Sequence, residues 1–273
     1  MSNAAEFRRR AEPFLLRHEA EHGLMLGLLR GIGSFPASGL AGLLVHDQLP
    51  ARDGEVAGVA LRLDTRLLVS RAESDSARNA LASALAVEPC TNVLGATSSV
   101  ERVAAGMRRE IVRRVAQGVY ANRRVIWPTD PPAGRRRLAS AADAETLIAW
   151  HMALSETIGH REDYGAARRS IARRLEQKAL HVWEAEGRIV SSAAAVDPTA
   201  HGIRVNLVFT PEELRGRGYA SFLVADLTHD LLQPGRDFVF LHTDLSNPTS
   251  NRIYRRIGYE RAGDFLLLEL APN

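Results

Sequence analysis

The stretch from Val205 to Gly258 decides the fold and reads VNLVFTPEELRGRGYASFLVADLTHDLLQPGRDFVFLHTDLSNPTSNRIYRRIG. Its pattern predicts a strand, a turn with two glycines, a helix, a second strand and a second helix. The turn reads Arg215-Gly216-Arg217-Gly218-Tyr219-Ala220, so small residues stand where the first helix begins. The first amides of a helix have no acceptor within the helix and lie at the positive end of its dipole. The turn therefore predicts a site for a diphosphate or a similar anion.

Two other phosphate-binding motifs do not fit this turn. A dinucleotide fingerprint needs a third glycine, but Ser221 stands at that position. In such a site the strand also runs straight into the first glycine, whereas residues 210–215 intervene here. No G-x-x-x-x-G-K-[ST] run occurs anywhere in the chain, which excludes a P-loop.

Composition narrows the class of protein. The chain has 273 residues, 45% hydrophobic and 25% charged, as is typical of globular proteins. Cys90 is the single cysteine, so no internal disulfide forms and a reducing, cytoplasmic location is expected. We expect no membrane span, because no run of eighteen apolar residues occurs, and no secretory signal.

The positive charges do not indicate a nucleic-acid partner. The formal net charge is only +3, and the cations are almost all arginine. Arginines gather at 135–137, 168–169 and 173–174, but no aromatic residues are interleaved with them. We interpret these clusters as solvated surface and expect no nucleic acid to bind.

A proline-rich segment predicts a division of the chain. Residues 128–134 read PTDPPAG, and such a run continues neither a helix nor a central strand. It separates residues 1–127 from residues 135–273, and each part is long enough for a core of its own.

The first part predicts helices alternating with short strands. A helix is expected over 5–30, with Pro13 as a break within it, and a second helix to Leu85 is expected to be capped by Ser74 or Asp75. Ser98 or Ser99 is expected to cap a third, longer helix to about Gln117. Strands are expected at 42–46, 56–63, 67–70, 92–96 and 119–127.

The second part repeats that rhythm. Helices are expected at 143–158, 163–178, 219–232 and 248–257, and strands at 137–139, 180–185, 188–196, 203–210, 238–243, 259–261 and 265–270. Where the second part has its glycine turn, the first part reads Arg71-Ala72-Glu73-Ser74-Asp75. These side chains block a diphosphate and the acids repel it, so we interpret the first part as a degenerate copy without an anion site.

The second part resembles the GCN5-related N-acetyltransferase superfamily. The signature [Q/R]-x-x-G-x-[G/A] of that family matches Arg215, Gly218 and Ala220. A second signature, an Asn followed by a helix with Tyr and then Gly-[Phe/Tyr], matches Asn247, Tyr254 and Gly258-Tyr259. The resemblance covers about 137–270 well. It implies an α/β (α+β) chain of tandem domains of this type, with mixed, mostly antiparallel twisted sheets flanked by helices.

The resemblance also implies a cofactor site. Acetyl-CoA would be the co-substrate, and its pantetheine arm would pair with the backbone of Leu207, Val208 and Phe209. Backbone amides at the turn would hold the diphosphate, with charge added by two arginines, and two asparagines would face the pantetheine arm or the adenine. The residues implied in these roles are Arg215, Gly216, Arg217, Gly218, Tyr219, Ala220, Asn247 and Asn251.

The expected reaction moves an acetyl or short acyl group directly to a primary amine. Tyr254 matches the general acid that protonates the leaving thiolate, and an amide of Val208 or Phe209 matches the oxyanion donor. The residues leave the general base open among Asp244, Asp197, Glu156, His151 and His160. Histidines and acids show no metal-ligand spacing, so no metal is expected.

The sequence leaves two other functions open. The chain fits a non-catalytic acyl-CoA sensor or partner-binding module, against which the presence of Tyr254 argues. It also fits a tRNA-dependent transferase, which would bind charged tRNA with an affinity that falls with salt. The expected acceptor is a small-molecule or peptide amine, and a homodimer is left open.

Overall fold

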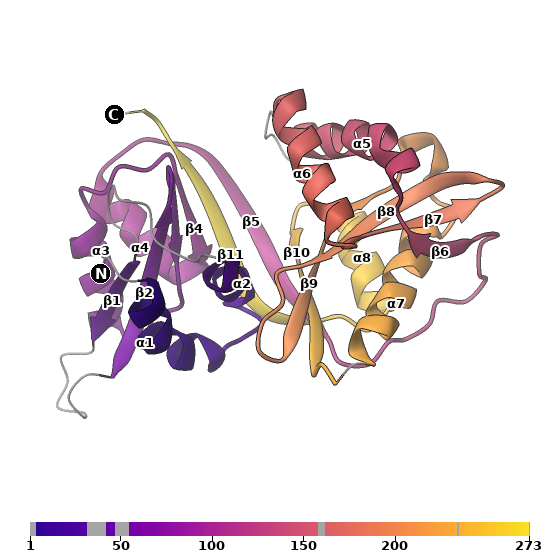
Figure 1. Ribbon diagram of the computed structural model, residues 1–273. Coiled ribbons are helices and arrows are strands. Elements are labelled where there is room, and N and C mark those ends of the chain that lie inside the picture. The colour runs from indigo at the N-terminus through magenta and orange to yellow at the C-terminus, as the bar shows by residue number, and fades with distance from the viewer. Residues whose placement is uncertain (1–3, 32–41, 47–54, 158–161, 234, 273) are drawn as a thin grey trace.

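The computed structural model describes residues 4–31, 42–46, 55–157, 162–233 and 235–272. Within this part, eleven strands form one mixed sheet in the order β1-β2-β3-β4-β11-β5-β10-β9-β8-β7-β6 (Figure 1). The strands are β1 (Gly42–His46), β2 (Val56–Leu63), β3 (Arg66–Val69), β4 (Asn92–Ala96), β5 (Ile111–Asn122), β6 (Arg135–Leu138), β7 (Leu180–Ala185), β8 (Arg188–Val196), β9 (Gly202–Phe209), β10 (Phe238–Asp244) and β11 (Glu260–Leu270). The pairs β3–β4 and β9–β10 are parallel, and the other pairs are antiparallel.

Helices cover both faces of the sheet in each half of the molecule. They are α1 (Ala4–Leu16), α2 (Gly23–Gly31), α3 (Asp75–Leu85), α4 (Thr97–Met107), α5 (Ala144–Thr157), α6 (Tyr164–Glu176), α7 (Tyr219–Leu232) and α8 (Pro248–Arg256), with short 3-10 turns at η1 (Ala141–Asp143) and η2 (Glu212–Leu214). In the N-terminal half, α3 and α4 pack on one cluster of buried side chains and α1 and α2 on another. In the C-terminal half, α7 and α8 share a cluster, and α5 and α6 share another. No helix of the described residues is both long and apolar enough to cross a bilayer.

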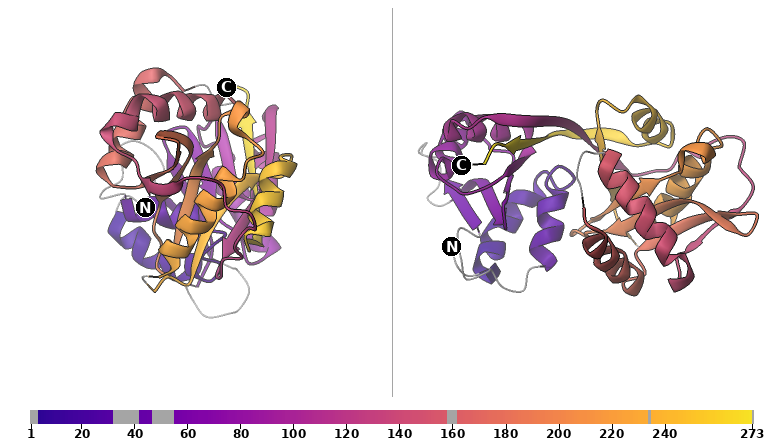
Figure 2. Two further views of the ribbon diagram at one scale, coloured as in Figure 1. Left: turned by 90° about the vertical axis from the view of Figure 1, so that its right-hand side faces the viewer. Right: turned by 90° about the horizontal axis from the view of Figure 1, so that it is seen from above.

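The two halves exchange their last strands. β5 follows α4 in the N-terminal half, yet it pairs with β10 of the C-terminal half from Gln117 to Asn122. β11 ends the C-terminal half, yet it pairs with β4 and lies between β4 and β5. Figures 1 and 2 show these two long strands running between the halves. The division at residues 128–134 stays a prediction, and the sheet itself is continuous across it.

Most of the elements expected from the sequence are present. The mixed α/β class, the hairpin of β7 and β8 and the bounds of α7 are confirmed. The side chain of Ser74 caps α3 by accepting the amide of Ala77, and Asp163 caps α6. Gly258 follows α8 with φ +96°, as a left-handed residue after a helix does.

Four expectations about elements are wrong. The predicted helix of residues 5–30 is two helices, and the break follows Leu16 while Pro13 lies inside α1. The predicted helix to Gln117 ends at Met107, after which Arg108 turns left-handed with φ +52°. The strand predicted at 119–127 is the end of β5, which begins at Ile111 because its whole length pairs with β11. The last strand is continuous, with a bulge at residues 261–263, where two short strands were expected.

Candidate active site

The parallel strands β9 and β10 separate partway along their length. They pair at Gly202–Phe238, Ile203–Val239 and Arg204–Phe240. Beyond that point β9 runs on to Phe209 and β10 to Asp244 without pairing to each other. We call this region the strand split. Its free edges leave backbone donors and acceptors that an extended ligand can bind in the manner of an added strand.

A backbone distortion lies on β9 at the strand split. Leu207 has φ +49°, which is rare for a residue with a branched side chain. The pairing with β8 shifts at the same place, since Asn206 pairs with Ala194 while Phe209 pairs with Ser192. A bulge of this kind bends the strand and re-aims the groups that follow it, here the amides of Val208 and Phe209.

The turn after β9 ends in a helix start without a side-chain cap. Gly216 and Gly218 have φ values of +80° and +82°, and Gly218 is the N-cap of α7. The first helical amide with an acceptor in the helix is that of Phe222, which donates to the Gly218 carbonyl at 3.0 Å. The amides of Tyr219, Ala220 and Ser221 precede it and have no acceptor within the helix. An anion at this position therefore meets free N–H groups at the positive end of the dipole.

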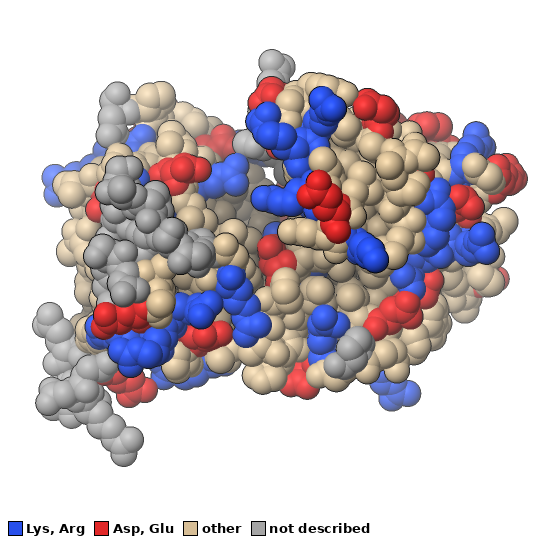
Figure 3. Space-filling view, in the orientation of Figure 1, with Lys and Arg blue, Asp and Glu red and all other residues tan. Residues whose placement is uncertain are grey.

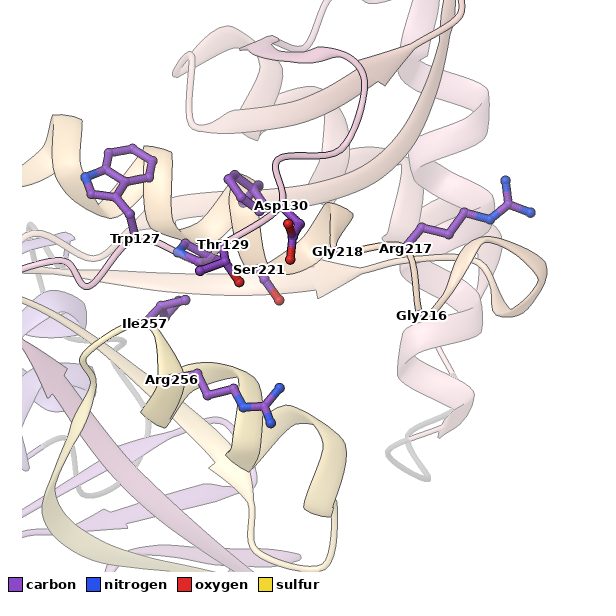
Figure 4. Close-up of a pocket in the computed structure, with 11 residues that line it drawn as sticks. Trp127, Thr129, Asp130, Gly216, Arg217, Gly218, Ser221, Arg256 and Ile257 are labelled. Carbon is purple, nitrogen blue, oxygen red and sulfur yellow. The ribbon is translucent and has the colours of Figure 1, made fainter.

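A hollow of about 680 Å³ adjoins this helix start, and we call it the turn pocket. It is lined by Trp127, Pro128, Thr129, Asp130, Gly216, Arg217, Gly218, Ser221, Phe222, Arg256 and Ile257. Figure 4 shows Thr129, Asp130 and Ser221 grouped near the start of α7, with Arg256 across the hollow from them. The side chain of Arg217 points away from this group.

Several lining residues were not found from the sequence. Residues 127–130 were interpreted only as the end of a strand and a linker, but they close one side of the turn pocket. Arg256 precedes Gly258 in the decisive stretch, and its position near the end of α8 was the available signal. Arg256 supplies the positive charge facing the pocket, against the single carboxylate of Asp130.

The two arginines expected at the turn bond to the turn itself. Arg215 Nε donates to the carbonyl of Thr210 at 3.1 Å, and Arg217 Nη2 donates to the carbonyl of Glu213 at 3.4 Å. Both side chains thus brace the segment between β9 and α7. Their charge still adds to the positive potential around the helix start.

Tyr254 lies on α8 in the core of the C-terminal half. Its side chain is 8% exposed and packs edge-on against Tyr259, with ring centroids 5.9 Å apart. Burial raises the pKa of the Tyr254 hydroxyl well above its usual value, because the interior disfavours the phenolate. The hydroxyl is therefore protonated over the whole neutral range.

Asn247 and Asn251 bond within their own segment. Asn247 is the N-cap of α8, and its side chain accepts the amide of Ser250 at 3.0 Å. The Asn251 amide donates to the carbonyls of Asp244 and Leu245 at 3.0 and 3.2 Å. These contacts fix the start of α8 and the loop that follows β10.

The candidates for a general base lie in different surroundings. Asp244 accepts the amide and hydroxyl of Ser246, and Asp197 pairs with Arg204 at the end of β9 remote from the turn. Glu156 is exposed on α5, while His151 Nε2 lies 2.7 Å from Glu162. His160 lies outside the described residues. Of these, His151 borders the strand split, in a small hollow with Leu207 and Phe209.

The matching region of the N-terminal half is closed. β3 pairs with β4 along its whole length, as far as Val69–Gly95. The amide of Arg71 donates to Nε2 of the buried His22 at 3.1 Å, and Ser74 caps α3. One amide in the first turn of α3, that of Ala77, thus has a side-chain partner, unlike the amides at the start of α7, and β3 and β4 do not separate. These contacts agree with the interpretation of this half as lacking an anion site, which stays a prediction.

No group of three or more potential metal ligands occurs among the described residues.

Residues 192–265 match the sequence profile of the FR47-like protein family. This segment contains β9, the turn, α7, β10, α8 and Tyr254. A search of curated proteins by sequence gave no match.

Solved structures share the fold at low identity. A GCN5-related N-acetyltransferase from Sphaerobacter thermophilus superimposes with a TM-score of 0.59 and 19% identity, over 94% of this chain and 92% of that one. One from Kribbella flavida gives 0.58 and 17%, over 94% and 96%. A GCN5-related N-acetyltransferase-like protein from Streptococcus suis gives 0.53 and 16%, over 98% and 99%. The chain therefore has the fold of the GCN5-related N-acetyltransferases, and its segment 192–265 resembles the FR47-like family.

Proposed function

We propose that the protein transfers an acetyl or short acyl group from acetyl-CoA to a primary amine. One observation carries this proposal: a free strand edge and an uncapped helix start follow each other along the chain, at β9 and α7. An extended arm that ends in a diphosphate needs both features together. The edge of Leu207, Val208 and Phe209 would pair with the pantetheine arm, and the amides of residues 217–221 would hold the diphosphate.

The turn pocket supports the same assignment. It opens beside Gly216 and Gly218, where a side chain at either position would have to adopt a strained backbone. Arg256 faces the pocket from α8 and would neutralise a phosphate oxygen. The exposed ring of Trp127 at the same pocket would cover an adenine or ribose.

Direct transfer needs three groups. The neutral amine attacks the thioester carbonyl, forming the C–N bond, while an amide after the Leu207 bulge stabilises the oxyanion. The C–S bond breaks, and Tyr254, whose hydroxyl is protonated at neutral pH, would donate its hydrogen to the leaving thiolate, so that the sulfur leaves as the thiol of CoA. The nitrogen of the tetrahedral adduct loses its extra proton to solvent or to a base, so that the product is a neutral amide, and Tyr254 is reprotonated from solvent.

Titration with acetyl-CoA, followed by release of free thiol in the presence of a panel of amines, tests the proposal. We expect micromolar binding of acetyl-CoA and amine-dependent thiol release. Tight binding without turnover on any amine favours the acyl-CoA sensor instead. Two results would overturn both functions: footprinting that shows no protection of the turn by acetyl-CoA, or a Gly218 variant that binds acetyl-CoA as tightly as the wild type does.

A further inference from the structure

Two buried polar atoms without a hydrogen-bond partner lie where β9 and β10 separate. They are Oδ1 of Asn206 and Nε2 of His242. Each residue stands two positions beyond the last parallel pair, Arg204–Phe240, on the part of its strand that no longer pairs with the other strand. Side chains alternate along a strand, so both lie on the face that also bears Arg204 and Phe240. Buried polar atoms are normally bonded, and two orphans facing one gap indicate a ligand.

The chemistry of these two atoms suits an amine. His242 lies between the rings of Phe240 and Phe265, at centroid distances of 6.5 and 4.6 Å. Burial, and next the charge of Arg204, lower the pKa of His242 to about 3, so the ring is neutral. A neutral imidazole nitrogen and an amide oxygen both accept hydrogen bonds. The N–H groups of a primary amine would satisfy both.

A guanidinium on the same side of the sheet is poorly neutralised. Arg174, in the last turn of α6, donates from Nη1 to the carbonyl and the hydroxyl of Ser170, while its Nε is buried without a hydrogen-bond partner. Burial and the neighbouring Arg173 and Arg204 lower the pKa of Arg174, while the opposing effects of Asp197 and Glu162 are smaller. Asp197 is already paired with Arg204. A guanidinium in this condition favours an anion with two oxygens, such as a carboxylate.

Arg204 connects the two features, because its charge acts on both His242 and Arg174. The surface is hollowed between the two halves of the molecule, and basic and acidic side chains meet at the rim of this hollow (Figure 3).

We propose that the acceptor is an amino acid or a short peptide, with its amine held by Asn206 and His242 and its carboxylate held by Arg174. This inference rests on the proposed acyl transfer and names its substrate class. The excess of positive charge around Arg174, where Arg173 and Arg204 outweigh Asp197 and Glu162, disfavours polyamines and aminoglycosides, because the further cations of such a ligand would be repelled there.

The test compares the twenty L-amino acids and glycylglycine with the amines that lack their carboxylate, such as phenethylamine for phenylalanine, and with spermidine. Free-thiol release by the full chain is the readout. We expect the best amino acid or peptide to exceed its matched amine at least ten-fold in kcat/KM. Arg174→Met should abolish that preference by lowering kcat/KM for the amino acid or peptide to the level of its matched amine.

Variants at the strand split test the amine end. Asn206→Ala and His242→Phe should raise KM for the acceptor about ten-fold or more and leave the dissociation constant of acetyl-CoA unchanged. His181→Phe is the matched control, because burial likewise lowers the pKa of the half-buried His181 on β7, to about 4, yet this residue contacts Arg136 away from the split. It should leave both constants unchanged.

The inference is overturned if spermidine or the matched amines are better substrates than the amino acids and glycylglycine. It is also overturned if the KM for the acceptor is unchanged in Asn206→Ala and His242→Phe. A wild-type chain that binds acetyl-CoA but acetylates nothing would instead contradict the proposed function. In that case the thermal shift given by the amino acids decides the acceptor site separately. The acceptor site is supported if amino acids raise the melting temperature of the wild type but not that of Arg174→Met or His242→Phe. It is overturned if they do not raise the melting temperature of the wild type.

Discussion

Tyr254 is the residue on which the proposed chemistry depends most. Substitution to Phe keeps the ring that packs on Tyr259 and removes only the hydroxyl. We expect kcat to fall about 100-fold, the lower range for loss of a general acid, with the affinity for acetyl-CoA unchanged. Thiol-release kinetics together with calorimetric titration of acetyl-CoA measure the two effects.

Tyr259 provides the control for that substitution. It is equally buried, but its hydroxyl lies 2.7 Å from that of Thr228, a contact inside the core. Tyr259→Phe should lower the free energy of unfolding by about 1 kcal/mol, the usual cost of one hydrogen bond, and leave kcat near the wild-type value. Equal losses of kcat in the two variants would show that Tyr254 acts through packing alone.

His22 makes the stability of the N-terminal half depend on pH. Its Nδ1 lies 2.9 Å from the carbonyl of Leu15, its Nε2 accepts the amide of Arg71, and burial lowers its pKa to about 4. The neutral ring is favoured in the folded state, so its contribution is complete above pH 6.5 and is lost as the pH falls toward 4. At pH 5 we expect a loss of about 2 kcal/mol from this residue.

Urea unfolding at pH 7.5 and pH 5 measures this loss. His22→Gln keeps a polar side chain that does not titrate, so the difference between the two pH values should shrink by roughly the same 2 kcal/mol. An equal pH dependence in both proteins would assign the acid sensitivity to other histidines, His181 and His242, whose pKa values are also lowered.

The element that distinguishes the C-terminal half is the turn between β9 and α7. A methyl group at Gly218 meets no atom closer than 3.8 Å, so Gly218→Ala costs chiefly the left-handed backbone, roughly 1–2 kcal/mol. The strain shifts the first amides of α7, and we expect affinity for acetyl-CoA to fall about ten-fold. Isothermal titration and urea unfolding record the two quantities.

Gly187, in the hairpin between β7 and β8, is the matched control. It has φ +73° and open space around it, so Gly187→Ala carries the same backbone strain away from the turn pocket. We expect both variants to lose a similar amount of stability, and only the Gly218 variant to lose affinity for acetyl-CoA. A comparable drop in affinity from Gly187→Ala would mean that destabilisation alone weakens binding.

At the scale of the whole molecule, the exchange of β5 and β11 makes each half depend on the other. Phe265, Leu266, Leu268 and Leu270 of β11 are buried against elements of the N-terminal half. We expect the chain to unfold in one transition rather than two. Separate fragments of residues 1–127 and 135–273 should not fold alone, since each lacks the strand that the other supplies.

Two probes test this cooperativity. The three tryptophans stand at 127, 150 and 183, so their fluorescence reports on the linker and the C-terminal half, whereas far-UV circular dichroism reports on the whole chain. Coincident urea transitions are expected. Two resolved transitions would indicate halves that are stable independently, as the proline-rich segment alone suggests.

Local patterns in the sequence were sufficient where neighbouring residues decide the structure. The bounds of α7 follow from Gly218 before it, and the start of α8 follows from Asn247-Pro248. The hairpin of β7 and β8 follows from Glu186-Gly187, both of which have positive φ. Such caps and turns act within a few residues, so they are readable without knowledge of the rest of the chain.

The site was predictable only in part. The turn glycines and Tyr254 stand at motif positions, whereas the residues that close the turn pocket come from the linker. The orphan atoms of Asn206 and His242 could not be foreseen, because their pairing depends on where β9 and β10 part.

The sequence by itself determined the secondary structure of residues 203–258 and the presence of an uncapped helix start for an anion. Only the tertiary structure decided the course of residues 98–117 and the union of both halves in one sheet. The apolar spacing of residues 111–117 is compatible with a helix, and it becomes a strand because β11, about 150 residues further along the chain, supplies its hydrogen-bond partners. Pairing over such a distance leaves no local pattern in the sequence.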